Sequence, residues 1–121
     1  MATVEKFEEL RVWQQARELN LMAYGVTTPM KDYPFVDQMR RAALSTMNNT
    51  AEGFERKTDA DFAHFITISK GSAGEVRSMS YAAEDLNYLE PDSALKLRKL
   101  SEELGAGLGS FSNYLRKNTN K

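Results

Sequence analysis

The chain has 121 residues and no Cys, and its 16 basic residues nearly balance 17 acidic ones, for a net charge of -1. This length suits one domain and is too short for a two-domain enzyme, while the charge balance excludes a uniformly basic nucleic-acid binder but not a local basic patch. The absence of Cys excludes disulfides, thiolate metal sites and cysteine nucleophiles, and the single His excludes a His-rich metal site.

Prolines and short polar turns divide the chain into four windows with helical periodicity. The windows cover residues 7–27, 35–57, 59–89 and 92–117. None alternates with period two over the length of a strand, and no Asn-Gly or Asp-Gly hairpin signal occurs. Because helices joined by short turns pack as antiparallel neighbours, we predict that residues 1–121 form one all-α domain, an antiparallel up-down-up-down four-helix bundle.

Window 7–27 has two apolar faces, of which one is enough to join a bundle core. This first face consists of Val12, Ala16, Leu19, Ala23 and Val26. The second face lies about 100° or more away around the helix and carries Leu10, Trp13, Arg17, Leu21 and Tyr24. Arg17 is one turn from Trp13, where it can stack on the ring. An exposed face rich in Trp, Tyr and Arg is typical of an interface, so we predict an oligomer contact here. The alternative is that Trp13 covers the open end of its own bundle.

Window 35–57 combines an apolar face with a polar stripe. The apolar face is Phe35, Met39, Ala43, Met47, Thr50 and Phe54, and the stripe is Gln38, Arg41, Ser45, Asn49, Glu52 and Arg56. At these spacings, stripe neighbours can touch. One interpretation is a nucleic-acid surface on which Arg41 and Arg56 meet phosphates, with Arg40 in the same basic region. The other is a polar network between helices or subunits, completed by Ser72 and Glu75. We favour the network because Glu52, at the centre of the stripe, would repel phosphate.

The last two windows have the clearest apolar faces. In window 59–89, after a predicted N-cap at Thr58, the face is Phe62, Phe65, Ile66, Ser69, Ser72, Ala73, Val76, Met79, Ala83 and Leu86. In window 92–117 it is the narrow stripe Leu97, Leu100, Leu104, Leu108, Phe111 and Leu115. Small residues flank that stripe: Ser101, Gly105, Gly109 and Ser112. Gly inside a helix costs about 1 kcal/mol relative to Ala, so the flank predicts close packing of a neighbouring backbone. The alternative is fraying or a kink between Gly105 and Gly109.

No constellation of residues indicates catalysis, a metal or a cofactor. Glu52 and Glu75 could pair as carboxylates, but neither begins the Glu-x-x-His motif of di-iron bundles, and His64 has no such partner. No Gly-rich phosphate loop precedes a helix and no nucleophile–base pair is evident. We therefore expect no enzyme activity, no cofactor and no small-molecule substrate.

Nothing in the sequence indicates export or membrane insertion. No apolar run approaches the ~18 residues that a membrane helix needs, and residues 1–9 lack the apolar stretch of a signal peptide. We expect a cytoplasmic protein that does not enter a membrane.

Four specific strings occur in the first three windows. They are the stretch Phe7–Leu19, two elements of window 35–57, Gln38-x-Arg-Arg-Ala-x-x-Ser45 and Asn49-x-Ala-Glu-Gly53, and Gly71-Ser-x-x-Glu75 in window 59–89. Together, over about residues 7–90, they resemble the four-helix-bundle family encoded by intervening sequences in bacterial 23S ribosomal RNA genes. The resemblance implies a bacterial source, a left-handed bundle, a homopentamer and no established catalytic activity. A related branch of this family comprises the accessory proteins of diversity-generating retroelements, which are basic nucleic-acid-binding rings that work with a reverse transcriptase.

These observations predict a non-enzymatic, oligomeric bundle with RNA or another nucleic acid as its expected partner. The alternative is an accessory factor that binds nucleic acid and a reverse transcriptase, and neighbouring genes would distinguish the two roles. The residues predicted for a nucleic-acid site or polar network are Arg40, Arg41, Ser45, Asn49, Glu52, Arg56, Ser72 and Glu75. The predicted oligomer interface is Leu10, Trp13, Arg17, Leu21 and Tyr24.

Overall fold

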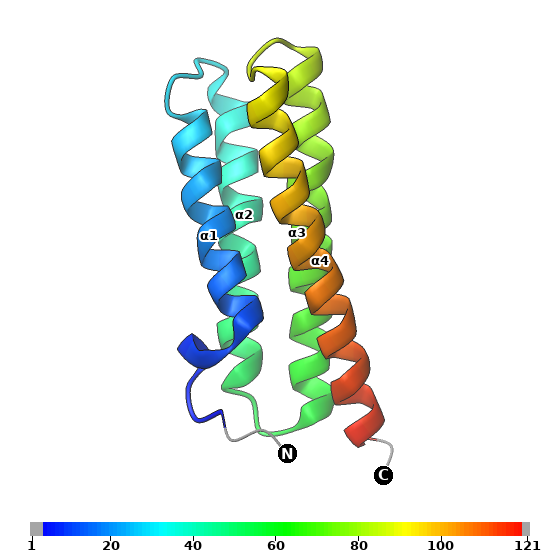
Figure 1. Cartoon of the computed structure of the whole chain (residues 1–121). Coiled ribbons are helices and arrows are strands. Elements are labelled where there is room, and N and C mark those ends of the chain that lie inside the picture. Colours follow the sequence, from blue (N-terminus) through cyan, green and yellow to red (C-terminus); the bar gives the residue numbers. More distant parts are fainter. Residues whose placement is uncertain (1–3, 120–121) are drawn as a thin grey trace.

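The computed structural model describes residues 4–119, which form four long α-helices after one short 3-10 helix (Figure 1). The elements are η1 (Phe7–Glu9), α1 (Arg11–Thr27), α2 (Tyr33–Phe54), α3 (Asp59–Asp85) and α4 (Pro91–Thr119). The four helices, of 17, 22, 27 and 29 residues, contain more than two-thirds of the chain. Within residues 4–119 there is no strand, so the all-α prediction is confirmed.

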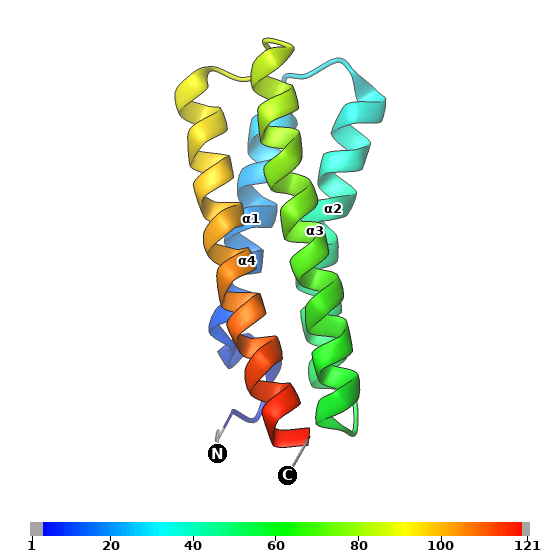
Figure 2. The ribbon, with the colours of Figure 1, turned by 90° about the vertical axis from the view of Figure 1, so that its right-hand side faces the viewer.

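Consecutive helices run in opposite directions around a common axis. The α1–α2 and α3–α4 loops lie at one end of the molecule, and the α2–α3 loop lies at the other (Figures 1 and 2). Contacts join α1 to α2, α2 to α3, α3 to α4, and α4 back to α1, with the most extensive packing between α3 and α4. This is the predicted four-helix bundle with up-down-up-down order.

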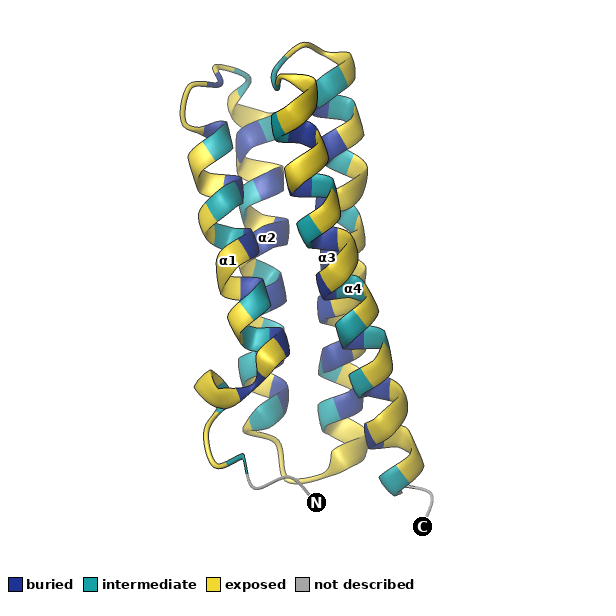
Figure 3. Ribbon diagram, in the orientation of Figure 1, coloured by how far each residue is buried: buried dark blue, intermediate teal, exposed yellow. Residues whose placement is uncertain are grey.

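The buried residues of each helix face the bundle axis (Figure 3). The largest fully buried apolar side chains are Leu19, Met39, Ile66, Leu97, Leu104 and Leu108. Burying one Leu, Ile or Met side chain contributes about 1.5–3 kcal/mol. The apolar stripe predicted for α4 lies in or against this core, as does the first apolar face of α1.

The C-terminal end of α3 differs from the prediction, because the helix ends at Asp85 rather than at residue 89. Asn87 adopts a left-handed conformation with φ 61°. Its amide donates to the Glu84 carbonyl at 3.0 Å, and the Tyr88 amide donates to the Ala83 carbonyl at 2.8 Å. This pair of hydrogen bonds is the Schellman arrangement that terminates a helix. Leu86, expected on the apolar face, is consequently 53% exposed.

The ends of α1 and α2 also differ from the predicted windows. Leu10 is extended, with φ -72° and ψ 127°, so α1 begins at Arg11 and residues 7–9 form a separate turn. Helix α2 begins at Tyr33 because Pro34 fits in a first helical turn, where its missing N–H costs nothing. It ends at Phe54, three residues before the predicted limit. The cap at Thr58 is confirmed, since its Oγ1 accepts a hydrogen bond from the Asp61 amide at 3.1 Å.

The predicted close backbone contact beside Gly105 and Gly109 is wrong. A Cβ atom at Gly105 would meet no neighbouring atom within 4 Å, and one at Gly109 would lie 3.3 Å from Cε of the Lys70 side chain. The tight position is Gly53 instead. A Cβ there would lie 2.8 Å from Cβ of Phe65 and 3.2 Å from the carbonyl oxygen of Phe62. Thus α2 and α3 approach each other closely where α2 ends.

Of the helices in residues 4–119, none is both long enough and apolar enough to cross a membrane.

Candidate functional site

The polar stripe of α2 is divided into separate contacts along the α2–α3 seam. Gln38 Nε2 donates to Glu75 Oε2 at 2.6 Å. Lower on the seam, the hydroxyls of Ser45 and Ser72 lie 2.9 Å apart, and Asn49 Nδ2 donates to Ser45 Oγ at 2.8 Å. The structure therefore brings Ser72 and Glu75 to the stripe, as the network interpretation expects.

The charged members of the stripe lie at the surface and pair locally. Glu52 and Arg56 form an ion pair of 2.9 Å, and both side chains are about half exposed. The Arg56 guanidinium also lies 4.6 Å from the centre of the Phe65 ring. Arg41 binds Asp37 at 2.8 Å rather than Ser45. The structure therefore does not join the stripe into one continuous network.

Arg40 points to a different helix. Its Nε donates to Thr27 Oγ1 at 2.9 Å, its Nη2 donates to the Tyr24 carbonyl at 3.3 Å, and its guanidinium lies 4.5 Å from the centre of the Tyr24 ring. Arg40 thus belongs to the α1–α2 seam and is separate from the polar stripe.

A buried set of hydroxyls lies beneath the stripe, and the sequence did not single it out as polar. Thr50 Oγ1 and Ser69 Oγ lie 3.0 Å apart, and both lie within hydrogen-bond distance of the Thr46 carbonyl. All three residues are fully buried. Thr50 and Ser69 were predicted to lie on the apolar faces of their helices, and their burial confirms this. Because their hydroxyls are satisfied, this set joins α2 to α3 and is unavailable to a ligand.

The second face of α1 is divided between core and surface. Leu10 is only 8% exposed, and the Trp13 ring packs against Phe7 with ring centres 5.2 Å apart. The Arg17 guanidinium lies 5.8 Å from the centre of the Trp13 ring, as expected. Leu21 and Tyr24 are 67% and 37% exposed. Only the C-terminal half of the predicted interface therefore offers a free apolar surface.

Leu44 of α2 extends this surface and was missed in the sequence. It is 37% exposed and lies one turn beyond Arg40. Because α1 and α2 are antiparallel, one turn along α2 from Arg40 corresponds to one turn back along α1 from Tyr24, which leads to Leu21. We call Leu21, Tyr24 and Leu44 the α1–α2 patch.

The opposite edge of α1 carries an apolar hollow against α4. Its volume is about 370 Å³, and it is lined by Leu10, Arg11, Val12, Gly107, Ser110 and Phe111. Gly107 lets the two helices approach here, since a Cβ atom would lie 3.3 Å from Cγ1 of Val12. We call this the α1–α4 hollow.

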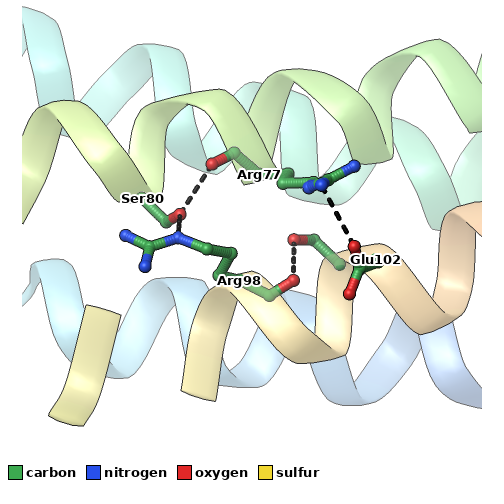
Figure 4. Close-up of polar contacts among 5 residues, drawn as sticks. Arg77, Ser80, Arg98 and Glu102 are labelled. Atoms are coloured by element: carbon green, nitrogen blue, oxygen red, sulfur yellow. Dashed lines mark hydrogen bonds and ion pairs between the residues drawn. The ribbon is translucent and has the colours of Figure 1, made fainter. Parts of the chain in front are cut away.

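Arginines line the α3–α4 seam. In its upper part they form hydrogen bonds and ion pairs with side chains of the neighbouring helix (Figure 4). Arg98 Nε donates to Ser80 Oγ at 3.0 Å, and its Nη2 binds Glu84 at 2.9 Å. Arg77 binds Glu102 across the seam at 3.0 Å. These contacts tie the two longest helices together.

In the lower part of the same seam, the described residues include cations that contact no carboxylate. Arg116 Nη2 donates to Thr67 Oγ1 at 3.0 Å, and Arg116 Nε donates to Ser112 Oγ at 3.3 Å. Lys70, one turn from Thr67, lies over Gly109. Neither Arg116 nor Lys70 forms an ion pair within residues 4–119. Sequence patterns gave no sign of this cluster, because its members come together only through the register of α3 against α4.

Among the described residues, no three His, Asp or Glu side chains are grouped closely enough to hold a metal ion. The pKa of Tyr88 is shifted by a contact with a structural role. The Tyr88 hydroxyl donates to Asp32 Oδ2 at 2.8 Å, and this hydrogen bond, together with burial and the negative charge of Asp32, raises the pKa of Tyr88 above its usual 10.0.

Comparison with known proteins places the chain in a family. A family model described as 23S rRNA-intervening sequence protein matches residues 8–110. The chain belongs to this family. The fold also matches a crystal structure described as a protein with unknown function from the S23 ribosomal protein family of Bacteroides thetaiotaomicron VPI-5482. That match has a TM-score of 0.78 at 19% identity and covers 84% of this chain and 97% of the other. No curated protein matches the chain. Membership of the intervening-sequence family confirms the resemblance inferred from the sequence strings.

Proposed function

We propose that this member of the intervening-sequence family is a non-enzymatic protein of the bacterial cytoplasm that assembles with copies of itself and associates with RNA. The observation that carries the assembly is that α1 borders an exposed apolar patch at one edge and an apolar hollow at the other. The α1–α2 patch lies at one edge and the α1–α4 hollow at the other.

Two different apolar surfaces favour a ring over a symmetric dimer. In a two-fold dimer a single surface meets itself, whereas a patch that meets a different surface on the next copy generates a ring when the rotation closes. Leu21 and Tyr24 project from the C-terminal half of α1, while Leu10 and Val12 line the hollow at its N-terminal end. Five copies is the number that the family resemblance implies.

The arginines beside the α1–α2 patch suit a protein interface. Arg17 and Arg40 lie over the rings of Trp13 and Tyr24, and neither forms an ion pair in the described part of the chain. Arginines stacked on aromatic rings keep little rotamer freedom, so less entropy is lost when a partner covers them. Trp, Tyr and Arg are also the residue types enriched at interface hot spots.

Sedimentation of the purified protein tests the assembly. We expect the parent to sediment as an oligomer at micromolar concentration and the double variant Leu21→Gln/Leu44→Gln to sediment at a lower mass. Ile68→Gln is the matched control, because Ile68 is similarly exposed at 39% but lies on α3. A monomeric parent, or a double variant with the parent's mass, would show that this patch is not the contact.

The RNA association is supported by family membership and by cations that have no carboxylate partner in the described part of the chain, among them Arg116 and Lys70. Binding of labelled 23S rRNA fragments over a salt series tests it. Phosphate contacts release counterions, so affinity must fall steeply as salt rises. Absence of binding at low salt would contradict the association.

A further inference from the structure

Three arginines on the α3–α4 seam provide an internal comparison. Arg98 and Arg116 are both on α4, and each donates through Nε and Nη2 to neighbours that include an α3 hydroxyl. Arg98 completes its contacts with the carboxylate of Glu84, and Arg77 binds Glu102. Arg116 instead binds only the hydroxyls of Thr67 and Ser112 within the described residues. These two hydrogen bonds hold the Arg116 guanidinium in place, but no carboxylate of the described residues neutralises its charge.

Lys70 brings to the same place a second cation that forms no ion pair within residues 4–119. Its aliphatic chain lies over Gly109, where a Cβ atom would be 3.3 Å from Lys70 Cε and 3.6 Å from Nζ. The glycine therefore leaves room for the lysine to lie along α4. This explains in physical terms a glycine that costs helix stability and contacts no neighbouring backbone.

The two cations line a groove rather than a flat surface. The lower groove, about 290 Å³ in volume, is lined by Thr67, Lys70, Gly109, Ser112, Asn113 and Arg116, and none of these is acidic. Lys70 also lines the next hollow along the seam, about 260 Å³ in volume, but there Arg77 is paired with Glu102. The cations without a carboxylate contact in the described residues are therefore concentrated in the lower groove, where a positively charged lining suits a nucleic-acid backbone.

We propose that the lower α3–α4 groove binds a backbone phosphate of RNA. The guanidinium of Arg116 retains N–H groups beyond the two it uses, and Lys70 supplies an ammonium charge. The Asn113 amide and the Thr67 and Ser112 hydroxyls lie in the same lining and add neutral hydrogen-bonding groups. Because contacts to a backbone phosphate carry no information about the base, this binding is independent of RNA sequence. This inference rests on the proposed RNA association and gives it a site.

The test is the double variant Lys70→Gln/Arg116→Gln in the full chain, with a labelled single-stranded RNA in a salt series. Loss of two phosphate contacts makes the slope of log affinity against log salt shallower by about 1.4, since each contact to a single strand contributes about 0.7. Lys96→Gln/Lys99→Gln is the matched control, because it removes the same charge from exposed positions elsewhere on α4. Both double variants should retain the parent's thermal unfolding temperature, since Lys70 and Arg116 are exposed.

The outcomes separate this inference from the proposed function. If the parent binds RNA and Lys70→Gln/Arg116→Gln does not lower the salt slope more than the control double variant does, the RNA association stands and the groove is not its site. If the parent binds no RNA, the proposed function fails. A titration with pyrophosphate, followed by amide NMR, then tests whether the groove binds phosphate at all. Shifts at Thr67, Lys70 and Asn113 that disappear in Lys70→Gln/Arg116→Gln would retain it as a site for a free phosphate, and their absence would overturn it. If a polyglutamate peptide competed for the groove as well as the phosphate ligand does, the groove would not be selective for phosphate and the proposal would be overturned.

Discussion

Gly53 shows how one missing methyl group sets the distance between two helices. A Cβ atom at this position would overlap the Phe65 side chain at 2.8 Å and press on the Phe62 carbonyl at 3.2 Å. Gly71 of α3 is the opposite case, because a Cβ atom there would meet nothing within 4 Å. The two glycines therefore have opposite roles although both lie in helices.

We predict opposite effects for the same substitution at these two glycines. Gly53→Ala should lower the free energy of unfolding by about 1–3 kcal/mol, because overpacking moves the α2–α3 contact. Gly71→Ala should raise it by about 0.5–1 kcal/mol, because Ala loses less backbone entropy in a helix. Urea denaturation of both variants measures these changes. A neutral or stabilising Gly53→Ala would mean that α2 and α3 can separate there at no cost.

At the scale of single residues, the sequence predicted contacts that depend on local spacing and missed those that depend on register. Arg17 over Trp13 and Asn49 bound to Ser45 are each four residues apart on one helix, and both were expected. The Thr67–Arg116 contact joins residues 49 apart in the chain. Helical periodicity contains no information about how far α4 is shifted along α3, so this cluster was found only in the structure.

At the scale of whole helices, the termini are set by side-chain caps and turns. Asp32 caps α2, because its Oδ1 accepts a hydrogen bond from the Phe35 amide at 3.3 Å. Its other carboxylate oxygen accepts from the Tyr88 hydroxyl at 2.8 Å. One carboxylate thus joins the start of α2 to the loop between α3 and α4. The sequence indicated breaks near these positions, but the Asn87 turn that moves Tyr88 out of α3 has no periodic signature.

This contact predicts a pH dependence with a definite sign. The hydrogen bond to Asp32 raises the pKa of Tyr88 in the folded state above its unfolded value. The stabilisation is therefore fully present below the unfolded pKa and is lost as the pH rises through the folded pKa. The difference in unfolding free energy between the parent and Tyr88→Phe should be constant from about pH 7 to about pH 9 and should shrink at higher pH.

Denaturation at a series of pH values measures this difference. Tyr33→Phe is the control, since the exposed Tyr33 hydroxyl has no hydrogen bond within the described chain. Asp32→Asn should return the pKa of Tyr88 toward 10.0 in a spectroscopic titration of tyrosinate, because the largest cause of the shift is removed. If Asp32→Asn left the titration unchanged, the hydrogen bond would not be the cause.

At the scale of the whole molecule, the bundle itself was predictable because each helix carries its own evidence. The Leu97–Leu115 stripe and the first face of α1 are local patterns, and short turns permit only antiparallel neighbours. The exposed apolar surface at the α1–α2 seam was less predictable. Leu10 was expected on the second face of α1, but the extended backbone at this residue turns it into the core. The free surface is consequently shorter than the pattern suggested and continues on α2 at Leu44.

Assembly through this surface predicts that thermal stability depends on protein concentration. A partner that binds only the folded chain shifts the unfolding equilibrium by mass action, so the oligomer should melt at higher temperature as concentration rises. Over about a hundredfold range in concentration, we expect the parent's melting temperature to increase by several degrees. Leu21→Gln/Leu44→Gln should melt at one temperature throughout this range, near the value of the diluted parent. Ile68→Gln should retain the parent's dependence, because Ile68 lies on α3. If the parent's melting temperature does not change with concentration, folding is complete in the single chain and the α1–α2 patch contributes nothing to it.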